Sequence, residues 1–382
     1  MKEYIELESR GSGPSYIRRD RLQELKDVQA IIFDCDGVLI DVGSSYAEAV
    51  KETVTSISKA YMGIEIPPEV IDGELIHRFK ATGGFNNDWA LSYAIQMYIF
   101  SLLGEDELQD LRGTAESSMK ISEVDQRFNQ LYSTERQYNI DMEGLHAGLI
   151  SFAECLDDSG PLSVDNQLLN KVGLELKRSL GYPGEGESGL IPTLFEYIFE
   201  GGELFAENFG FHPKFNIPVT GLVEKGEMII SGETLESLAS SLGGFKFGIA
   251  SGSLERTAKH VLGEFSDYFI EEAEIWMDDV NEEMKETGED GLRKPDPFSL
   301  FEAVKALEPF KRALYVGDSM ADLLMAERAR YQKDRYSFAG VYQHVYPSDK
   351  TMEGFMERGS DIVAPSVNEL PVVLNWIKGC KI

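Results

Sequence analysis

Residues 30–38 read AIIFDCDGV, and they are the clearest indication of fold in this chain. The first four residues form a short apolar run with β-branched and aromatic side chains, which is typical of a buried parallel strand. Two carboxylates, Asp34 and Asp36, follow directly. Such a pair is costly at the end of a buried strand unless something neutralises it. Because ligands of open α/β sheets bind at this end of the strands, the stretch predicts a strand that leads into a ligand site.

Further apolar runs of the same kind recur later in the chain, each followed by polar or small residues. They lie at 245–250, 313–316, 337–341 and 361–364. Helical patterns begin after them, at Ser253, Ser319, Lys350 and Val367. Strands that alternate with helices of this length are typical of βαβ units, so the sequence predicts a doubly wound, Rossmann-like parallel sheet.

Between the first strand and the second the pattern changes, because residues 43–222 show only amphipathic helical stretches. The clearest of them lie at 44–63, 86–104, 124–138 and 166–180. We therefore expect an α/β core domain of residues 22–42 and 223–382, interrupted by an enlarged helical cap domain of residues 43–222. Residues 1–21 are expected to be an N-terminal extension, and 271–291 a loop or short helix at one edge.

The composition excludes several classes of partner. The 382 residues include 36 Lys and Arg but 66 Asp and Glu, which gives a net charge of −30. Nucleic acids and anionic membranes need a basic surface, so neither is expected as a partner. Three cysteines are too few for a disulfide framework, and neither a signal peptide nor a membrane span is apparent. The sequence predicts a soluble, cytoplasmic protein of unspecified oligomeric state.

Three more polar groups stand where later strands end or helices begin. Ser251-Gly252-Ser253 offers a hydroxyl and backbone N–H groups that suit a phosphate. Lys294 lies in the proline-flanked sequence RKPDP, and Asp318 follows the strand at 313–316, with Asp322 one helical turn further on. Each residue alone could be a helix cap or a solvated charge. Together, at the same edge of a sheet, they indicate a catalytic site.

With these four segments the sequence resembles the haloacid dehalogenase-like superfamily. The motifs are FDCDGV at 33–38, IASGS at 249–253, KPDP at 294–297 and YVGDSMAD at 315–322. The chain is similar to the branch whose cap domain is inserted directly after the first motif. The interval of 217 residues between Asp34 and Ser251 is far longer than a usual cap of that branch.

The resemblance implies a role for each motif residue. Asp34 is expected to be the nucleophile that forms an aspartyl-phosphate, and Asp36 the general acid and base. Lys294, Ser251 and the backbone of Gly252 are expected to hold the phosphoryl oxygens. The expected cofactor is Mg²⁺, held by Asp34, the Asp36 carbonyl and Asp318, with Asp322 placed to orient a metal-bound water.

Two residues of the cap are candidates for substrate contact. Lys80 and Asn86 lie in the sequence KATGGFNNDW at 80–89, before a predicted helix. We expect Lys80 to meet an anionic group of the substrate and Asn86 a hydroxyl. The alternative is that this segment is a helix-capping turn with no role in binding.

The activity predicted from these residues is Mg²⁺-dependent hydrolysis of a small phosphorylated metabolite. Asp36 favours phosphoryl transfer over dehalogenation, which needs no second carboxylate. A phosphomutase of the same architecture is an alternative, in which a second substrate takes the phosphoryl group. A non-catalytic binding scaffold is a further alternative, although it would have no use for Asp34, Asp36 and Lys294 together.

Overall fold

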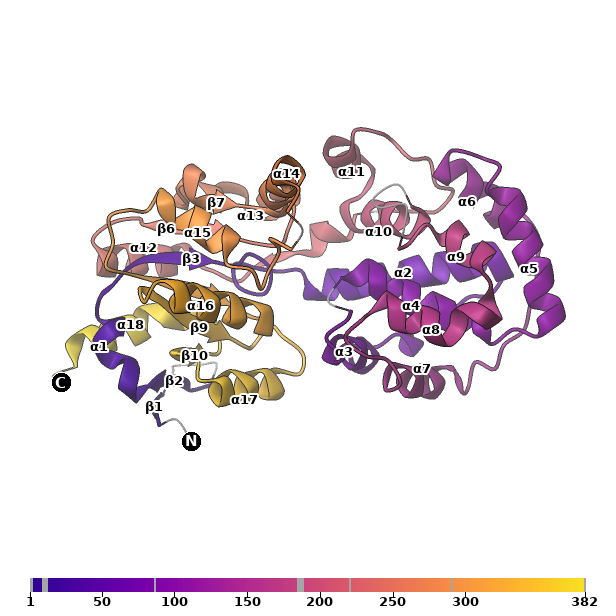
Figure 1. Cartoon of the computed structure of the whole chain (residues 1–382). Coiled ribbons are helices and arrows are strands. Elements are labelled where there is room, and N and C mark those ends of the chain that lie inside the picture. Colours follow the sequence, from indigo (N-terminus) through magenta and orange to yellow (C-terminus); the bar gives the residue numbers. More distant parts are fainter. Residues whose placement is uncertain are drawn as a thin grey trace. The chain divides into compact units, whose positions relative to one another are not determined.

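The computed structural model describes residues 3–8, 13–85, 87–183, 189–219, 221–289 and 291–380. Contacts within the chain divide it into two compact units, each described separately below. The α/β unit comprises Met1–Gly43 and Gly226–Ile382, and the helical unit comprises Ser44–Lys225 (Figure 1).

The α/β unit is built on one eight-stranded sheet with the order β1-β2-β10-β9-β8-β3-β6-β7. All neighbours from β10 to β7 are parallel, whereas β1 and β2 run antiparallel at one edge. The strands are β1 (Tyr4–Leu7), β2 (Ser15–Arg18), β3 (Val28–Phe33), β6 (Phe247–Ala250), β7 (Glu274–Ile275), β8 (Arg312–Gly317), β9 (Tyr336–Val341) and β10 (Ile362–Ala364). The predicted doubly wound parallel sheet is therefore confirmed.

Helices cover both faces of this sheet. They are α1 (Leu22–Leu25), α12 (Gly232–Leu242), α13 (Glu255–Leu262), α14 (Met277–Thr287), α15 (Phe298–Lys305), α16 (Met320–Gln332), α17 (Ser348–Arg358) and α18 (Leu370–Gly379). α15, α16 and α17 pack on one face, and α12 packs against β3 and α18 on the other. Short 3₁₀ segments lie at Arg19–Arg21, Gly263–Tyr268, Glu271–Ala273 and Val367–Glu369.

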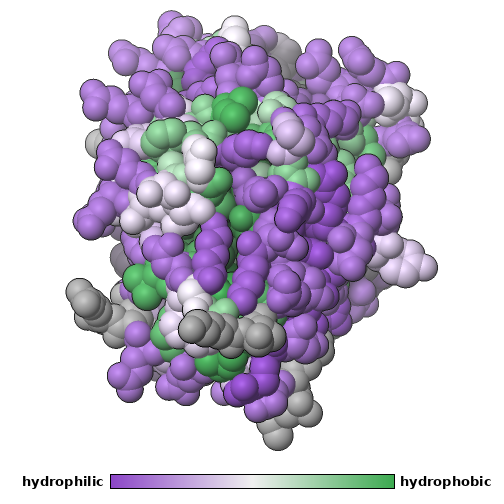
Figure 2. Space-filling view, turned by 90° about the vertical axis from the view of Figure 1, so that its left-hand side faces the viewer, coloured by the Kyte–Doolittle hydropathy of each residue, from purple (hydrophilic) through white to green (hydrophobic). Residues whose placement is uncertain are grey.

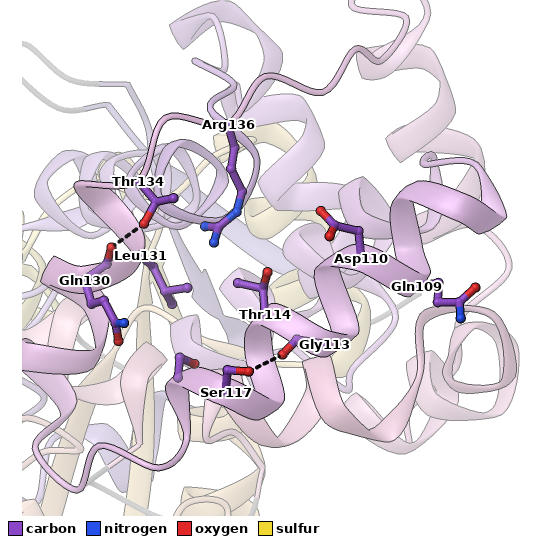
Figure 3. Close-up of a pocket in the computed structure, with 10 residues that line it drawn as sticks. Gln109, Asp110, Gly113, Thr114, Ser117, Gln130, Leu131, Thr134 and Arg136 are labelled. Carbon is purple, nitrogen blue, oxygen red and sulfur yellow. Dashed lines mark hydrogen bonds between the residues drawn. The ribbon is translucent and has the colours of Figure 1, made fainter.

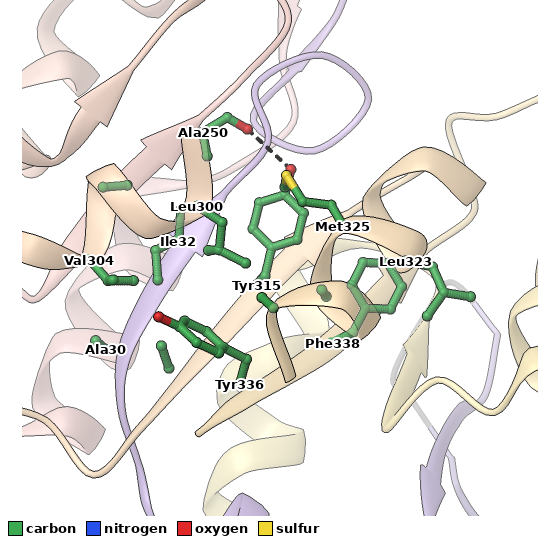
Figure 4. Close-up of a cluster of buried hydrophobic side chains, with 14 of the residues drawn as sticks. Ala30, Ile32, Ala250, Leu300, Val304, Tyr315, Leu323, Met325, Tyr336 and Phe338 are labelled. Carbon is green, nitrogen blue, oxygen red and sulfur yellow. Dashed lines mark hydrogen bonds between the residues drawn. The ribbon is translucent and has the colours of Figure 1, made fainter. Parts of the chain in front are cut away.

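The core beneath α15, α16 and α17 follows the two-residue period of the strands. Ala30 and Ile32 of β3 contribute to it, together with Tyr315, Phe338 and Leu300 from neighbouring elements (Figure 4). Every one of these side chains is fully buried. Alternate residues of β3 face the opposite side of the sheet, so the strand is apolar on both faces and forms the centre of the unit.

The order of the strands fixes where the polar residues at their ends lie. β3 has β8 on one side and β6 on the other, with Phe33 paired to Val316 and to Ile249. The chain leaves β3 towards β6 but leaves β8 towards β9, so the winding reverses between β3 and β8. Such a reversal leaves a crevice beyond the carboxyl ends of the strands, where ligands of α/β sheets bind.

The two chain segments that lead into and out of the helical unit pair with each other within the α/β unit. β4 (Ile40–Asp41) follows the first polar loop and pairs antiparallel with β5 (Glu227–Met228), just before and after the helical unit. The sequence did not predict this ladder, because two residues are too few to show a strand pattern.

The helical unit contains only helices among its described residues, as the sequence predicted. They are α2 (Gly43–Met62), α3 (Gly73–Ala81), α4 (Asp88–Ser101), α5 (Glu105–Ser118), α6 (Val124–Tyr132), α7 (Leu145–Ala153), α8 (Pro161–Val172), α9 (Leu174–Leu180), α10 (Leu190–Glu200) and α11 (Gly202–Phe209), with 3₁₀ turns at Pro68–Val70 and Leu222–Lys225. The stretch 166–180, predicted as one helix, is broken at Gly173. That residue has φ +98°, a conformation that ends α8.

Hydrophilic side chains cover most of the face of the molecule that Figure 2 shows, with smaller hydrophobic areas between them. This distribution agrees with the large excess of acidic residues in the chain. Among the described residues, no helix is both long enough and apolar enough to cross a membrane.

The N-terminal residues differ from expectation, because the segment predicted as an extension supplies β1 and β2 to the sheet. β2 pairs with β10 and is held there by a buried carboxylate, Asp361, which has no exposed surface. Asp361 forms ion pairs with Arg330, Arg21 and Arg18, and accepts a hydrogen bond from the Phe338 N–H at 2.9 Å. The charged cluster therefore fixes the added strands to the parallel sheet.

We predict that Asp361→Ala lowers the free energy of unfolding by about 3–5 kcal/mol, because it removes the fully buried carboxylate that three half-buried arginines share. The control is Asp20→Ala, which removes an exposed partner of Arg18 and should cost less than about 1 kcal/mol. The measurement is urea unfolding followed by tryptophan fluorescence. Equal effects of the two substitutions would contradict the importance of the buried cluster.

Candidate active site

The polar groups predicted to form the site do meet at one edge of the sheet. Asp34 follows β3, Ser251 follows β6, and Asp318 follows β8. The Asp34 N–H donates to the Val316 carbonyl at 2.8 Å, which continues the ladder between β3 and β8 by one residue. The first carboxylate of the site is therefore positioned by the sheet itself.

Lys294 is the cation at the centre of the site. It lies before α15, and its Nζ is 2.8 Å from Asp34 Oδ1 and 2.8 Å from Asp322 Oδ1. The ammonium also lies 5.5 Å from the centre of the Tyr315 ring. Only 14 % of the Lys294 side chain is exposed, so it is a buried charge held between two carboxylates rather than a solvated one.

Asp322 is saturated by hydrogen-bond donors. Besides Lys294, its Oδ1 accepts from the Tyr315 hydroxyl at 2.8 Å. Its Oδ2 accepts from the N–H and the hydroxyl of Ser319, at 3.0 and 2.6 Å. Ser319 is the N-cap of α16, and its hydroxyl accepts in return from the Asp322 N–H. Both oxygens of Asp322 are thus engaged by the protein, which makes it an anchor for Lys294.

Asp36 is held by a different set of groups. The Ser253 hydroxyl donates to Asp36 Oδ2 at 2.8 Å, and Ser251 Oγ lies 3.1 Å from Ser253 Oγ. A hydroxyl carries one proton, so Ser253 must accept from Ser251 in this arrangement. The two carboxylates at the end of β3 therefore have separate partners, Lys294 for Asp34 and a serine for Asp36.

Burial and charge move the pKa values of this cluster in opposite directions. Burial raises the pKa of Asp34 to about 6, although the Lys294 ammonium opposes the rise. Burial and the neighbouring carboxylates of Asp322 and Asp34 raise the pKa of Asp318 well above its usual value. Burial also disfavours ionised Asp322, but Lys294 holds the pKa of that carboxyl below its usual range. Negative charge is therefore in excess around Asp318.

The donor set fits a divalent cation with hard ligands. Carboxylate oxygens of Asp34, Asp318 and Asp322 lie within 4.8 Å of one another, and those of Asp34 and Asp318 are the ones that the donors around Asp322 leave for a cation. The backbone of the loop approaches closely as well, because a Cβ added to Gly37 would lie 1.9 Å from Asp318 Oδ2. Oxygen ligands of this kind suit Mg²⁺. The single positive charge of Lys294 does not balance the negative charge of three carboxylates. A divalent cation bound here would offset the remainder.

The structure places the remaining predicted residues as follows. Gly252 is exposed at the end of β6, beside Ser251. Lys80 lies on α3 and forms an ion pair with Asp88 at 3.0 Å, while Asn87 caps α4 through its side chain. This is the capping turn that the sequence offered as an alternative, and Lys80 as a substrate ligand stays a prediction. Asn86 lies outside the described residues.

Two residues of the site were not predicted from the sequence. The sequence motifs assign no role to Ser253, and they include Tyr315 only as an apolar residue of its strand. The Tyr315 hydroxyl joins Asp322 to the Ala250 carbonyl at the end of β6. The position of Tyr315 two residues before Gly317-Asp318 could have suggested that its hydroxyl reaches the end of the sheet, since alternate strand residues share a face.

Comparison with known proteins gave the following similarities. Residues 195–330 match the family model of haloacid dehalogenase-like hydrolases, a range that includes Ser251, Lys294, Asp318 and Asp322 but not Asp34. A comparison with curated proteins found no match.

Among solved structures, a target of the Northeast Structural Genomics Consortium is similar, with a TM-score of 0.64 and 18 % identity over 91 % of this chain and 98 % of that one. Phosphatase Tt82 from Thermococcus thioreducens is similar with a TM-score of 0.51 and 20 % identity over 92 % and 99 %. At such identities the similarity concerns the fold. The similarity to haloacid dehalogenase-like hydrolases therefore covers residues 195–330, and the likeness to the solved structures over most of the chain is one of fold.

Proposed function

We propose that the protein is a Mg²⁺-dependent phosphatase that hydrolyses a small phosphorylated metabolite through an aspartyl-phosphate on Asp34. The observation that carries the proposal is that the two carboxylates after β3 have different partners. Asp34 contacts the ammonium of Lys294, whereas Asp36 is held by Ser253. A nucleophile beside a fixed cation, with an acid two residues away, is what phosphoryl transfer requires.

The first step is attack by Asp34 on phosphorus. Its Oδ1 accepts from the Cys35 N–H at 2.8 Å and contacts Lys294, which leaves Oδ2 as the oxygen able to attack. A P–O bond to Asp34 forms while the bond to the leaving oxygen breaks, and Asp36 donates its proton to that oxygen. In the second step Asp36 takes a proton from water, whose oxygen attacks phosphorus; the bond between phosphorus and Asp34 breaks, which frees the Asp34 carboxylate and releases inorganic phosphate.

Positive charge has to offset the repulsion between Asp34 and the phosphate. Each pair of like charges at 4 Å costs about 4 kcal/mol at an effective dielectric constant near 20. Lys294 provides one positive charge at this point, and Mg²⁺ held by Asp34, Asp318 and the Asp36 carbonyl would supply electrostatic stabilisation of the phosphoryl oxygens. Asp322 keeps Lys294 in place. The Gly252 N–H donates to the remaining phosphoryl oxygens, and the Ser251 hydroxyl does so once it turns from Ser253 to the substrate.

The test is phosphate release from a panel of phosphorylated metabolites, with and without Mg²⁺. The proposal predicts release of inorganic phosphate from at least one member in the presence of the ion. Transfer of the phosphoryl group to a second substrate hydroxyl, without release of phosphate, would instead indicate a phosphomutase. Binding without either reaction would contradict a catalytic role.

Asp34→Asn should abolish turnover and leave the fold intact, because the amide has the same shape but does not attack phosphorus. The measurement is phosphate release by the variant at saturating substrate, with circular dichroism as the check of folding. Activity above about one per cent of the wild-type value would contradict covalent catalysis through Asp34.

Removal of divalent cations with EDTA should abolish activity, and Mg²⁺ should restore it better than Ca²⁺. Ca²⁺ takes more ligands at longer distances than Mg²⁺, which disturbs in-line geometry. Mg²⁺ should also raise the melting temperature of the EDTA-treated protein, because it relieves repulsion among the buried carboxylates. Asp318→Asn should reduce that rise, and an unchanged rise would place the ion elsewhere.

Ser253→Ala should lower kcat about tenfold, or about 1.4 kcal/mol, with little change in KM, because Asp36 loses its hydroxyl donor. Ser253→Thr keeps a hydroxyl at the same position and should restore most of the rate. The measurement is steady-state kinetics of both variants on the best substrate of the panel. If threonine fails to restore the rate, or if KM alone changes, Ser253 does not position Asp36.

A further inference from the structure

The helical unit contains a cavity of about 390 Å³ between α5 and α6. This volume is within the range of about 300–1,000 Å³ that is usual for small-molecule sites. The side chains around it are mostly hydroxyls and amides, with one guanidinium (Figure 3). They include Gln109, Thr114, Ser117, Gln130, Leu131 and Arg136.

Several polar groups of the cavity have no hydrogen-bond partner among the described residues. The Ser117 and Thr134 hydroxyls donate to backbone carbonyls within their own helical turns. By contrast, the Thr114 hydroxyl and the side-chain amides of Gln109 and Gln130 have no such bond within the described ranges. Three neutral groups, each able to donate and accept, are therefore open to a ligand in the cavity.

Arg136 provides the charge of the cavity. Its Nη1 is buried, and no described residue offers it a hydrogen-bond partner. The segment that carries Arg136 is fixed, because the Tyr138 N–H donates to the Met62 carbonyl at 3.1 Å. A Cβ at Gly63 would lie 1.8 Å from the Arg136 carbonyl, so this backbone contact depends on glycine. The fold thus holds the backbone that carries Arg136, and the buried Nη1 of the side chain has no hydrogen-bond acceptor among the described residues.

The carboxylate of the cavity does not fill this role. The Tyr138 hydroxyl donates to Asp110 Oδ2 at 2.5 Å, and no ion pair joins Asp110 to Arg136 among the described residues. In Figure 3 the Arg136 side chain extends towards the space between Thr114 and Leu131. A buried guanidinium N–H group without an acceptor is costly, and a carboxylate or phosphate bound at Nη1 removes that cost through a charge-assisted N–H···O bond.

We propose that this cavity binds a small hydroxylated anion, whose carboxylate or phosphate pairs with Arg136 and whose hydroxyls meet Thr114, Gln109 and Gln130. Leu131 is the one large apolar side chain of the lining, so an apolar ligand is a poor fit. The site uses none of the residues assigned to phosphoryl transfer. It therefore adds a second ligand site to the proposed phosphatase, in the part of the chain that makes its helical insertion unusually long.

The experiment is isothermal titration calorimetry of the full chain with gluconate, as a hydroxylated carboxylate, and glucose 6-phosphate, as a hydroxylated phosphate. Asp34→Asn protein is used throughout, so that neither compound is turned over. We expect at least one of them to bind with a Kd in the millimolar range or below. Acetate and inorganic phosphate, which lack carbon-bound hydroxyls, should bind more weakly at this site.

Two substitutions test the location. Arg136→Gln should weaken binding at least tenfold, whereas Arg178→Gln, on an exposed arginine of α9 outside the cavity lining, should change it less than twofold. Thr114→Val should weaken gluconate or glucose 6-phosphate severalfold and leave acetate or phosphate unchanged, which a general loss of folding would not do. The proposal is wrong if neither compound binds, or if Arg136→Gln binds as tightly as the Arg178→Gln control.

Discussion

The arrangement of the α/β unit depends on one buried ammonium, Lys294, placed between the carboxylates of Asp34 and Asp322. Burial alone would lower the pKa of this lysine, but the two carboxylates raise it above its usual value, so it stays charged. Three parts of the fold must meet for the lysine to lie here: the end of β3, the loop before α15 and the N-terminus of α16. The anchoring of Asp322 by Tyr315 and Ser319 makes this charge a fixed part of the sheet edge.

Much of the α/β unit could be predicted because its parallel strands are apolar on both faces. Such strands appear as continuous apolar runs, so the strands before Asp34, Ser251 and Asp318 were found from composition alone. The sequence did not predict β1, β2 and β7. These strands have only two to four residues, lie towards the edges of the sheet and are only partly apolar, so they form neither an apolar run nor a regular alternation. The break between α8 and α9 at Gly173 was not predicted either, because the backbone conformation that a glycine adopts depends on its tertiary surroundings.

The residues of the candidate site could be predicted as chemical types, but their partners could not. The sequence indicated that Asp34, Asp36, Lys294 and Asp318 belong to one edge, because polar residues that follow parallel strands lie at the same edge of a sheet. It gave no means of deciding that Asp36 is held by Ser253, whose hydroxyl could equally have capped α13. The open groups around Arg136 were likewise invisible, because they belong to different helices whose packing determines which side chains meet.

The attachment of β2 to β10 has a consequence for the solubility of the sheet. β10 has only three residues and would be the outer strand of the parallel sheet without the N-terminal hairpin. Its unpaired backbone groups would then be a template on which another chain could add a strand. With the hairpin in place, the outermost strand is β1, which is only four residues long and carries a carboxylate, Glu6, in its exposed row. The ion pairs of Asp361 with Arg18, Arg21 and Arg330 hold these strands in place and thereby oppose association of the sheet through its edge.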